Sequence, residues 1–115
     1  MKIRTLALLN SVALISLALP GASFAGMANP SRVINVSSFT TGQFVFEQNG
    51  TRVTPPGCAA GTPTRWAVDV TTPAGQATQA TILSAFALGR LVYLYGTNTC
   101  SVDPTSETVL YITVQ

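Results

Sequence analysis

Apolar and polar side chains alternate along three short segments, which is the pattern of β-strands with one buried face. The segments cover residues 32–39, 43–48 and 65–70. In the second segment Phe44 and Phe46 share one face, and the Asn49-Gly50 pair that follows is a strong turn signal. We therefore expect three half-buried strands, preceded by a loose N-terminal arm over residues 26–31.

The period changes to three or four residues after the third strand, which indicates a helix. Thr72 is a suitable N-cap, Pro73 suits the first helical position, and Gly89 suits the end of the helix. We expect small side chains to let this helix lie close against a sheet. These side chains are Ala77, Ala80, Ser84 and Ala87.

Two later segments, 91–96 and 107–114, are almost continuously apolar. Such runs are typical of strands buried on both faces, or of strands with one face in the core and the other in an interface. The predicted order is therefore β-β-β-α-β-β. This order matches the five-stranded OB-fold barrel, which has a helix between its third and fourth strands. An open sheet with one packed helix is the alternative fold.

The N-terminus has the parts of a secretory signal peptide: a basic start, an apolar run and small residues before a cleavage point. They are Lys2 and Arg4, residues 6–19, and Ser23 and Ala25. The apolar run is shorter than the ~20 residues of a transmembrane helix. We expect residues 1–25 to be a cleaved signal and residues 26–115 to be one domain. Its predicted location is the periplasm or the exterior of a Gram-negative bacterium.

Export changes the charge balance of the chain. Two of the six basic residues, Lys2 and Arg4, lie in the predicted signal, so the remaining bases equal the four acidic residues in number. A neutral domain lacks the basic surface that nucleic acid and anionic membranes attract. We therefore expect neither of these partners, and we expect no membrane span after cleavage. A neutral surface rich in hydroxyl groups suits self-association or an uncharged polar ligand such as a glycan.

Cys58 and Cys100 are the two cysteines of the chain. In an oxidising compartment an even number of cysteines favours pairing. A nucleophilic thiol needs a nearby base, and the sequence contains no histidine. The spacing also differs from a C-x-x-C redox pair, and further metal-ligating Cys or His residues are absent. We predict a disulfide that stabilises the domain, and we predict neither a metal nor a cofactor.

The predicted order of elements, one long-range disulfide and the segment "ALGRLVYLYGTNTC" together resemble the B subunits of AB5 toxins, of the subtilase-cytotoxin and pertussis-toxin types. The specific resemblance covers about half of the exported domain. It implies an OB fold, a ring of five subunits and glycan binding by that ring. The resemblance assigns no sugar-contacting residue to a position of this sequence.

Four residues are candidates for contact with a ligand. Arg65 could donate hydrogen bonds to a sugar or a carboxylate; the alternative is a surface arginine paired with Asp69. Trp66 could stack on a sugar ring, although its alternation with valines favours core packing. Tyr93 and Tyr95 share a face and could line a ligand groove or a subunit interface; barrel packing is the alternative.

Catalysis is not expected. Glu47 and Asp69 could face each other across neighbouring strands as glycosidase carboxylates do. Each lies opposite the apolar face of its strand, however, which favours a solvated sheet surface. Two other functions remain: a monomeric periplasmic inhibitor or accessory protein that presents the loop from Thr54 to Thr64 to a protein partner, and a structural component of the envelope.

Overall fold

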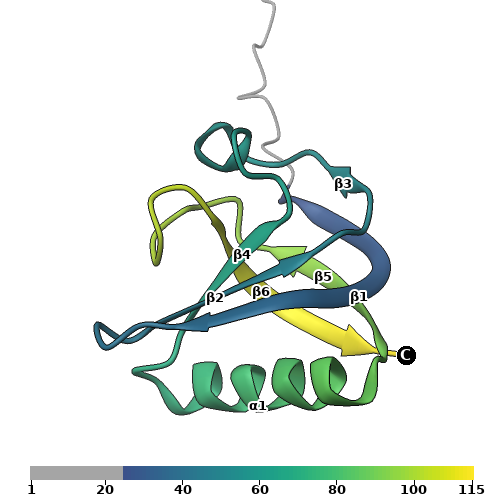
Figure 1. Ribbon diagram of the computed structural model, residues 1–115. Coiled ribbons are helices and arrows are strands. Elements are labelled where there is room, and N and C mark those ends of the chain that lie inside the picture. Colours follow the sequence, from purple (N-terminus) through teal and green to yellow (C-terminus); the bar gives the residue numbers. More distant parts are fainter. Residues whose placement is uncertain (1–24) are drawn as a thin grey trace, which may run out of the picture.

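The computed structural model describes residues 25–115, so the predicted signal peptide lies outside the described residues except for Ala25. Five strands pair edge to edge and close into a ring (Figure 1). In ring order they are β1 (Met27–Ser38), β2 (Gln43–Gln48), β4 (Arg65–Asp69), β6 (Glu107–Val114) and β5 (Leu91–Gly96), which pairs with β1. The pairing of β4 with β6 is parallel and the other four pairings are antiparallel. The predicted mainly β fold with one helix is therefore confirmed.

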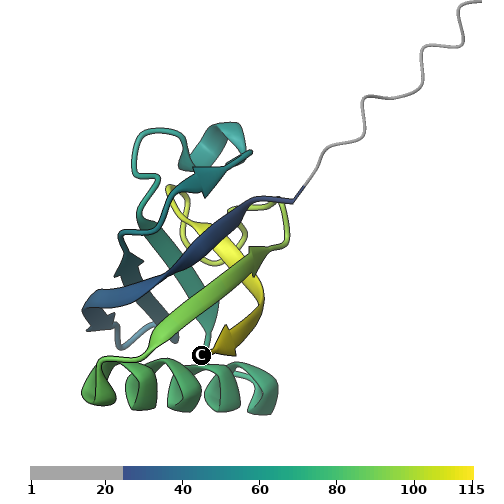
Figure 2. The same ribbon diagram turned by 90° about the vertical axis from the view of Figure 1, so that its right-hand side faces the viewer.

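The order of elements differs from the prediction in one place. A short strand β3 (Arg52–Val53) and a 3₁₀ turn η1 (Gly57–Ala59) lie between β2 and β4. The turn falls within the predicted loop from Thr54 to Thr64, and β3 precedes that loop, where the sequence predicted no strand. β3 pairs with the first residues of β1, outside the ring of five. Here β3 and η1 lie at the end of the barrel away from the helix (Figure 2).

β1 begins earlier than the sequence indicated. The predicted loose arm, residues 26–31, was wrong, because Met27 and Ala28 pair with both β3 and β5. The register against β2 shifts between Val33 and Asn35, so a bulge interrupts the alternation at Ile34. Val33 is consequently buried, whereas Ile34 is 51% exposed.

Helix α1 (Pro73–Leu88) begins and ends where the sequence predicted. The Thr72 hydroxyl accepts a hydrogen bond from the Gly75 amide at 3.0 Å, and Gly89 has a φ of 63°, in the left-handed region that favours glycine. The helix lies across one end of the barrel and contacts β1, β4, β5 and β6 (Figure 1).

The face that α1 buries was predicted wrongly. The buried side chains are Ile82 and Ala85. The small residues expected at the sheet are exposed: Ala77, Ala80, Ser84 and Ala87. Apolar side chains occur all round this helix, so periodicity alone did not distinguish the two faces. The large residues Leu83 and Phe86 also remain about 40% exposed.

The barrel interior is filled by alternating side chains of the strands, as the sequence predicted. Phe44 and Phe46 of β2, Trp66 and Val68 of β4, and Leu94 of β5 belong to one buried cluster. On β5 and β6 the outward side chains are partly or fully exposed. The two apolar runs therefore have one face in the core and one face open, so they are not buried on both faces.

The Cys58–Cys100 disulfide is present, with the two Cα atoms 6.3 Å apart. It joins the β3–β4 loop (residues 54–64) to the β5–β6 loop (residues 97–106). A second link is the Thr62 hydroxyl, which donates to the Thr105 carbonyl at 2.5 Å. A disulfide is compatible with the predicted exported location. Across residues 25–115 no helix is long and apolar enough to cross a membrane.

Candidate functional site

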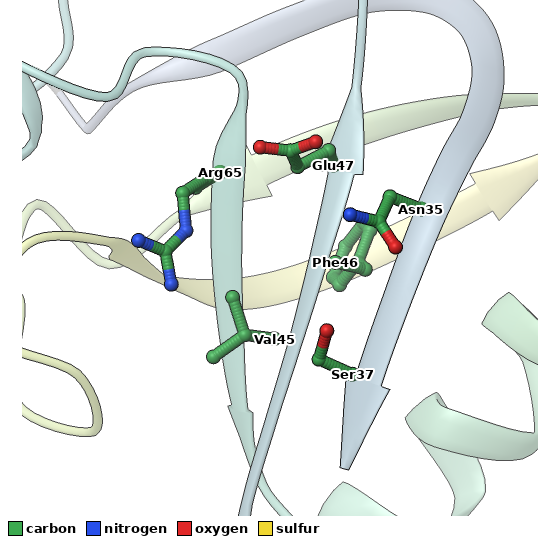
Figure 3. Close-up of a pocket in the computed structure, with 6 residues that line it drawn as sticks. All are labelled: Asn35, Ser37, Val45, Phe46, Glu47 and Arg65. Atoms are coloured by element: carbon green, nitrogen blue, oxygen red, sulfur yellow. The ribbon is translucent and has the colours of Figure 1, made fainter.

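A polar pocket of about 200 Å³ lies on the outer surface of β1, β2 and β4. The register places Asn35 opposite Glu47, and Glu47 opposite Arg65, so these three side chains form one row across three neighbouring strands. Figure 3 shows the Glu47 carboxylate between the Arg65 guanidinium and the Asn35 amide. A carboxylate, a guanidinium and an amide therefore line one partly exposed pocket.

The next row of side chains forms the lower part of the pocket. Ser37 lies opposite Val45, and both line the pocket together with Phe46 (Figure 3). Val45 is buried although it points away from the barrel core, and its neighbour Ala67 is buried as well. The pocket thus combines a hydroxyl and an apolar surface with the polar row above it.

The β5–β6 loop lies beside this pocket on the outer face of β2 and β4. The Gln43 side chain donates a hydrogen bond to the Val102 carbonyl at 2.7 Å, and the Arg65 guanidinium lies 3.9 Å from the Asp103 carboxylate. A second hollow of about 250 Å³ borders the same loop, between Val102 and the turn from β1 to β2 at Gly42. The loop that Cys100 anchors therefore lines the second hollow and contacts Arg65, a residue of the first pocket.

The ionisable side chains of this face form different contacts from those predicted. Arg65 lies near Asp103 and not near Asp69. Asp69 accepts hydrogen bonds from the Thr71 hydroxyl and amide, which lower the pKa of Asp69. Burial raises the pKa of Asp103, but hydrogen bonds from Thr105 and the charge of Arg65 outweigh it, so the pKa of Asp103 is lowered overall.

Glu47 and Asp69 do not form a pair of facing carboxylates. In the antiparallel register Glu47 lies opposite Arg65, and Asp69 lies opposite Gln43, at the other end of the same strand pair. Two acids held at opposite ends of a ladder cannot flank one glycosidic bond. Among residues 25–115 no group of three or more metal-ligating side chains gathers either.

Trp66 has no exposed surface and packs in the core. The Arg52 guanidinium of β3 lies over its ring, 3.6 Å from the ring centre. Arg52 also forms an ion pair with Glu107, whose side chain is completely buried. Burial lowers the pKa of Arg52 and the charge of Glu107 opposes that change. In this structure Trp66 supports a buried ion pair and is not available to a sugar.

Tyr93 and Tyr95 lie on the open face of β5, next to Tyr111 of β6. The Tyr93 and Tyr95 rings meet edge to face with centres 4.9 Å apart, and the Tyr95 and Tyr111 rings stack at 4.6 Å. Tyr93 donates a hydrogen bond to the Tyr95 hydroxyl at 2.9 Å. This tyrosine cluster is separate from the pocket, because it lies on other strands of the ring.

The pKa values of Tyr93 and Tyr111 in this cluster are raised. The hydrogen bond to Tyr95, with burial, raises the pKa of Tyr93 to about 12, and burial and Tyr95 raise the pKa of Tyr111. Because the folded pKa of Tyr93 exceeds the unfolded value of about 10, its contribution to stability is present below pH ~10 and is lost as the pH rises through about 12.

The Tyr95→Phe variant tests this assignment. We expect the pKa of Tyr93 to fall toward ~10, measured by NMR of ¹³C-labelled tyrosine, because the hydrogen-bond acceptor is lost. The Tyr111→Phe variant keeps the Tyr93–Tyr95 hydrogen bond and should lower the pKa of Tyr93 much less. An unchanged Tyr93 midpoint in Tyr95→Phe would contradict the assigned cause.

Comparison of the chain with protein-family models, with curated proteins and with solved structures finds no match. The pocket is therefore interpreted from its own geometry and chemistry.

Of the four residues that the sequence nominated, Arg65 lines the pocket, Trp66 is in the core, and Tyr93 and Tyr95 form the separate cluster. Asn35, Ser37 and Glu47 line the pocket, and the sequence nominated none of them as a ligand contact. The alternating pattern of the sequence places these residues on the polar side of their strands. The sequence does not predict the register that brings the strands side by side.

Proposed function

We propose that this protein is an exported, disulfide-bonded binding module with an OB fold, which binds an uncharged polar ligand of the glycan class on the outer face of β1, β2 and β4. The observation that carries the proposal is the row of Asn35, Glu47 and Arg65 above the floor of the pocket. Sugar hydroxyls donate and accept hydrogen bonds, and this row offers both donors and acceptors without a net charge.

The topology supports the OB-fold assignment. The ring of five strands closes through one parallel pair, β4 with β6, and the helix lies between the third and fourth strands of the ring in chain order. OB folds bind oligosaccharides and oligonucleotides on the face of their second and third strands and with two adjoining loops. In this chain that face is formed by β2 and β4, and the β5–β6 loop adjoins it.

Variants of the pocket test the proposal. We expect Arg65→Met and Glu47→Gln each to weaken binding of a glycan identified on an array by about tenfold, because each removes a charged hydrogen-bonding group from the site. Arg32→Met is the matched control, since Arg32 is an exposed arginine of β1 outside the pocket. Isothermal titration calorimetry measures the affinities. Equal affinity in Arg65→Met and Arg32→Met would contradict the proposed site.

We also propose that the protein self-associates, as the resemblance to AB5 B subunits implies. The open face of β5 and β6 carries Leu91 and Tyr111, which are 41% and 46% exposed, and Leu110 of β6 is 62% exposed. A small neutral domain gains free energy when such side chains are buried against a second copy.

Light scattering on a sizing column gives the solution mass. A mass near five subunits is expected for a toxin-like ring, and a Tyr111→Lys variant should shift it toward the monomer. A monomer at all protein concentrations would contradict self-association and leave the pocket proposal unaffected.

A second function, in which the β3–β4 loop inserts into the cleft of a protein partner, is favoured by the rigidity of that loop. It is held by the Cys58–Cys100 disulfide, by Thr62, and by the Arg52 side chain, which donates to the Pro63 carbonyl at 3.0 Å. A pre-ordered loop loses little entropy on binding. Substitution of the exposed Thr64 by arginine would weaken this interaction and spare glycan binding.

A further inference from the structure

The carboxylate of Glu107 lies in a closely fitting site at the beginning of β1. Its Oε2 atom accepts hydrogen bonds from the Gly26 nitrogen at 3.0 Å and from the Asn98 nitrogen at 2.9 Å. Its Oε1 atom pairs with Arg52. The carboxylate is completely shielded from water, so each of these contacts is made at low dielectric.

Glycine is required on both sides of this carboxylate. A Cβ atom at position 26 would lie 2.1 Å from Oε1, and a Cβ atom at Gly96 would lie 1.8 Å from Oε2. The main chain of Gly26 is also fixed, because its carbonyl accepts a hydrogen bond from the Gly96 nitrogen at 2.7 Å. The close packing of Gly26 on Glu107 and the hydrogen bond of the Gly26 carbonyl therefore both hold the Gly26 nitrogen beside the carboxylate.

Gly26 is also the first residue after the predicted cleavage point. Hydrolysis of the Ala25–Gly26 peptide bond adds one water molecule, leaving a carboxylate on Ala25 and a free amine on Gly26. That amine takes up a proton and becomes an ammonium group at neutral pH. The same nitrogen that donates one amide hydrogen bond to Glu107 would then carry a full positive charge.

We propose that Glu107 is a binding site for the N-terminal ammonium group that export processing creates at Gly26. The inference rests on the export that is part of the proposed function, and it is independent of the ligand. Each carboxylate oxygen then binds one cation: Oε1 pairs with Arg52, and Oε2 pairs with the ammonium group. Removal of Ala25 also frees the Thr54 hydroxyl, which donates to the Ala25 carbonyl at 3.3 Å, to accept a hydrogen from the new amine.

The charged and titratable groups around this nitrogen set the sign of its titration. Glu107 attracts the ammonium group directly, while the Arg52 guanidinium, which also adjoins Gly26, repels it and is paired with Glu107. The phenols of Tyr93 and Tyr95 pack beside Met27, the next residue, and are uncharged at neutral pH. Burial and Arg52 lower the pKa of the Gly26 amine, and we expect the directly bonded carboxylate to outweigh both, so that this pKa lies above its unfolded value of ~8.

Linkage fixes how stability depends on pH. Because the folded pKa exceeds the unfolded one, the added stability is present below pH ~8 and is lost as the pH rises through the folded value. Gly26 is buried in the folded domain, so cleavage has to precede its burial. Processing during export meets this requirement.

Three chains test the proposal: one that begins with a free Gly26 amine, one with the Gly26 amine acetylated, and one that begins at Ala25. The acetylated chain is the matched control, because it keeps the N–H donor and lacks the charge. We expect the free chain to have the highest urea midpoint at pH 7. The difference in urea midpoint between the free chain and the other two should disappear by pH ~10. Titration of the tyrosines does not affect this difference, because all three chains contain the same tyrosines.

The amine itself can be titrated by NMR in protein labelled with ¹³Cα-glycine, in which one glycine signal should move with a midpoint above the ~8 of an unperturbed α-amine. A midpoint at or below ~8, or equal urea midpoints for the free and acetylated chains at pH 7, would overturn the proposal.

Mass spectrometry of the exported protein should give Gly26 as the first residue, and any other N-terminus would also overturn it. None of these measurements involves the pocket. A failure of the glycan-binding proposal is therefore distinguishable from a failure of the proposed ammonium site at Glu107.

Discussion

The Glu107→Gln variant is expected to lose about 3–5 kcal/mol of unfolding free energy, because removing one member of a buried ion pair leaves the other charge uncompensated. Arg52 is that remaining charge, and its side chain is 6% exposed. Glutamine has nearly the shape of glutamate, so the loss reports charge and not packing. Urea denaturation at pH 7 measures it, and the midpoint of thermal unfolding should fall by tens of degrees.

Glu47→Gln is the matched control for this experiment. It makes the same chemical change on a half-exposed residue of the barrel surface and should alter stability by no more than about 0.5 kcal/mol. The double variant Arg52→Met/Glu107→Gln removes both charges and should be more stable than Glu107→Gln alone. If the double variant is less stable, the ion pair is not the source of the effect.

Loss of the Cys58–Cys100 disulfide is the second large effect that we expect. The bridge joins residues separated by 42 positions, for which the chain-entropy model gives about 4 kcal/mol. A small domain is stable by only about 5–15 kcal/mol, so the Cys58→Ser/Cys100→Ser variant should be only marginally folded. Urea denaturation of this variant, compared with the oxidised protein, measures the loss.

The reduced wild-type protein is the control, since it removes the bond and keeps both sulfur atoms. It should match the double-serine variant within about 1 kcal/mol. The bridge also holds the β5–β6 loop, which lines the second hollow at Val102 and approaches Arg65 of the first pocket through Asp103. Reduction should therefore weaken ligand binding before it unfolds the barrel. An unchanged urea midpoint after reduction would contradict a stabilising role.

Several features were predictable from sequence because the information is local. The ends of α1 depend on Thr72, Pro73 and Gly89, which act within one turn of the chain. The strands follow from alternation, which places Phe44 and Phe46 on one face wherever that strand lies. The pairing of Cys58 with Cys100 needed no geometry, since two cysteines allow one intramolecular bond.

Other features depend on partners that are distant in the sequence. The early start of β1 follows from its pairing with β3 and β5, and the bulge at Ile34 follows from its register against β2. Neither can be derived from the residues of β1 alone. The buried face of α1 was likewise undetermined, because both of its faces offer apolar side chains.

The sequence by itself determined the strands, the helix with its caps, the disulfide and the equal numbers of acidic and basic residues in the segment 26–115. Tertiary structure alone decided which polar residues meet. It brought Asn35, Glu47 and Arg65 into one row, and it buried Glu107 against Arg52 although 55 residues separate them. The physical reason is that periodicity and capping act over a few residues, whereas register and ring closure depend on contacts between segments far apart in the chain.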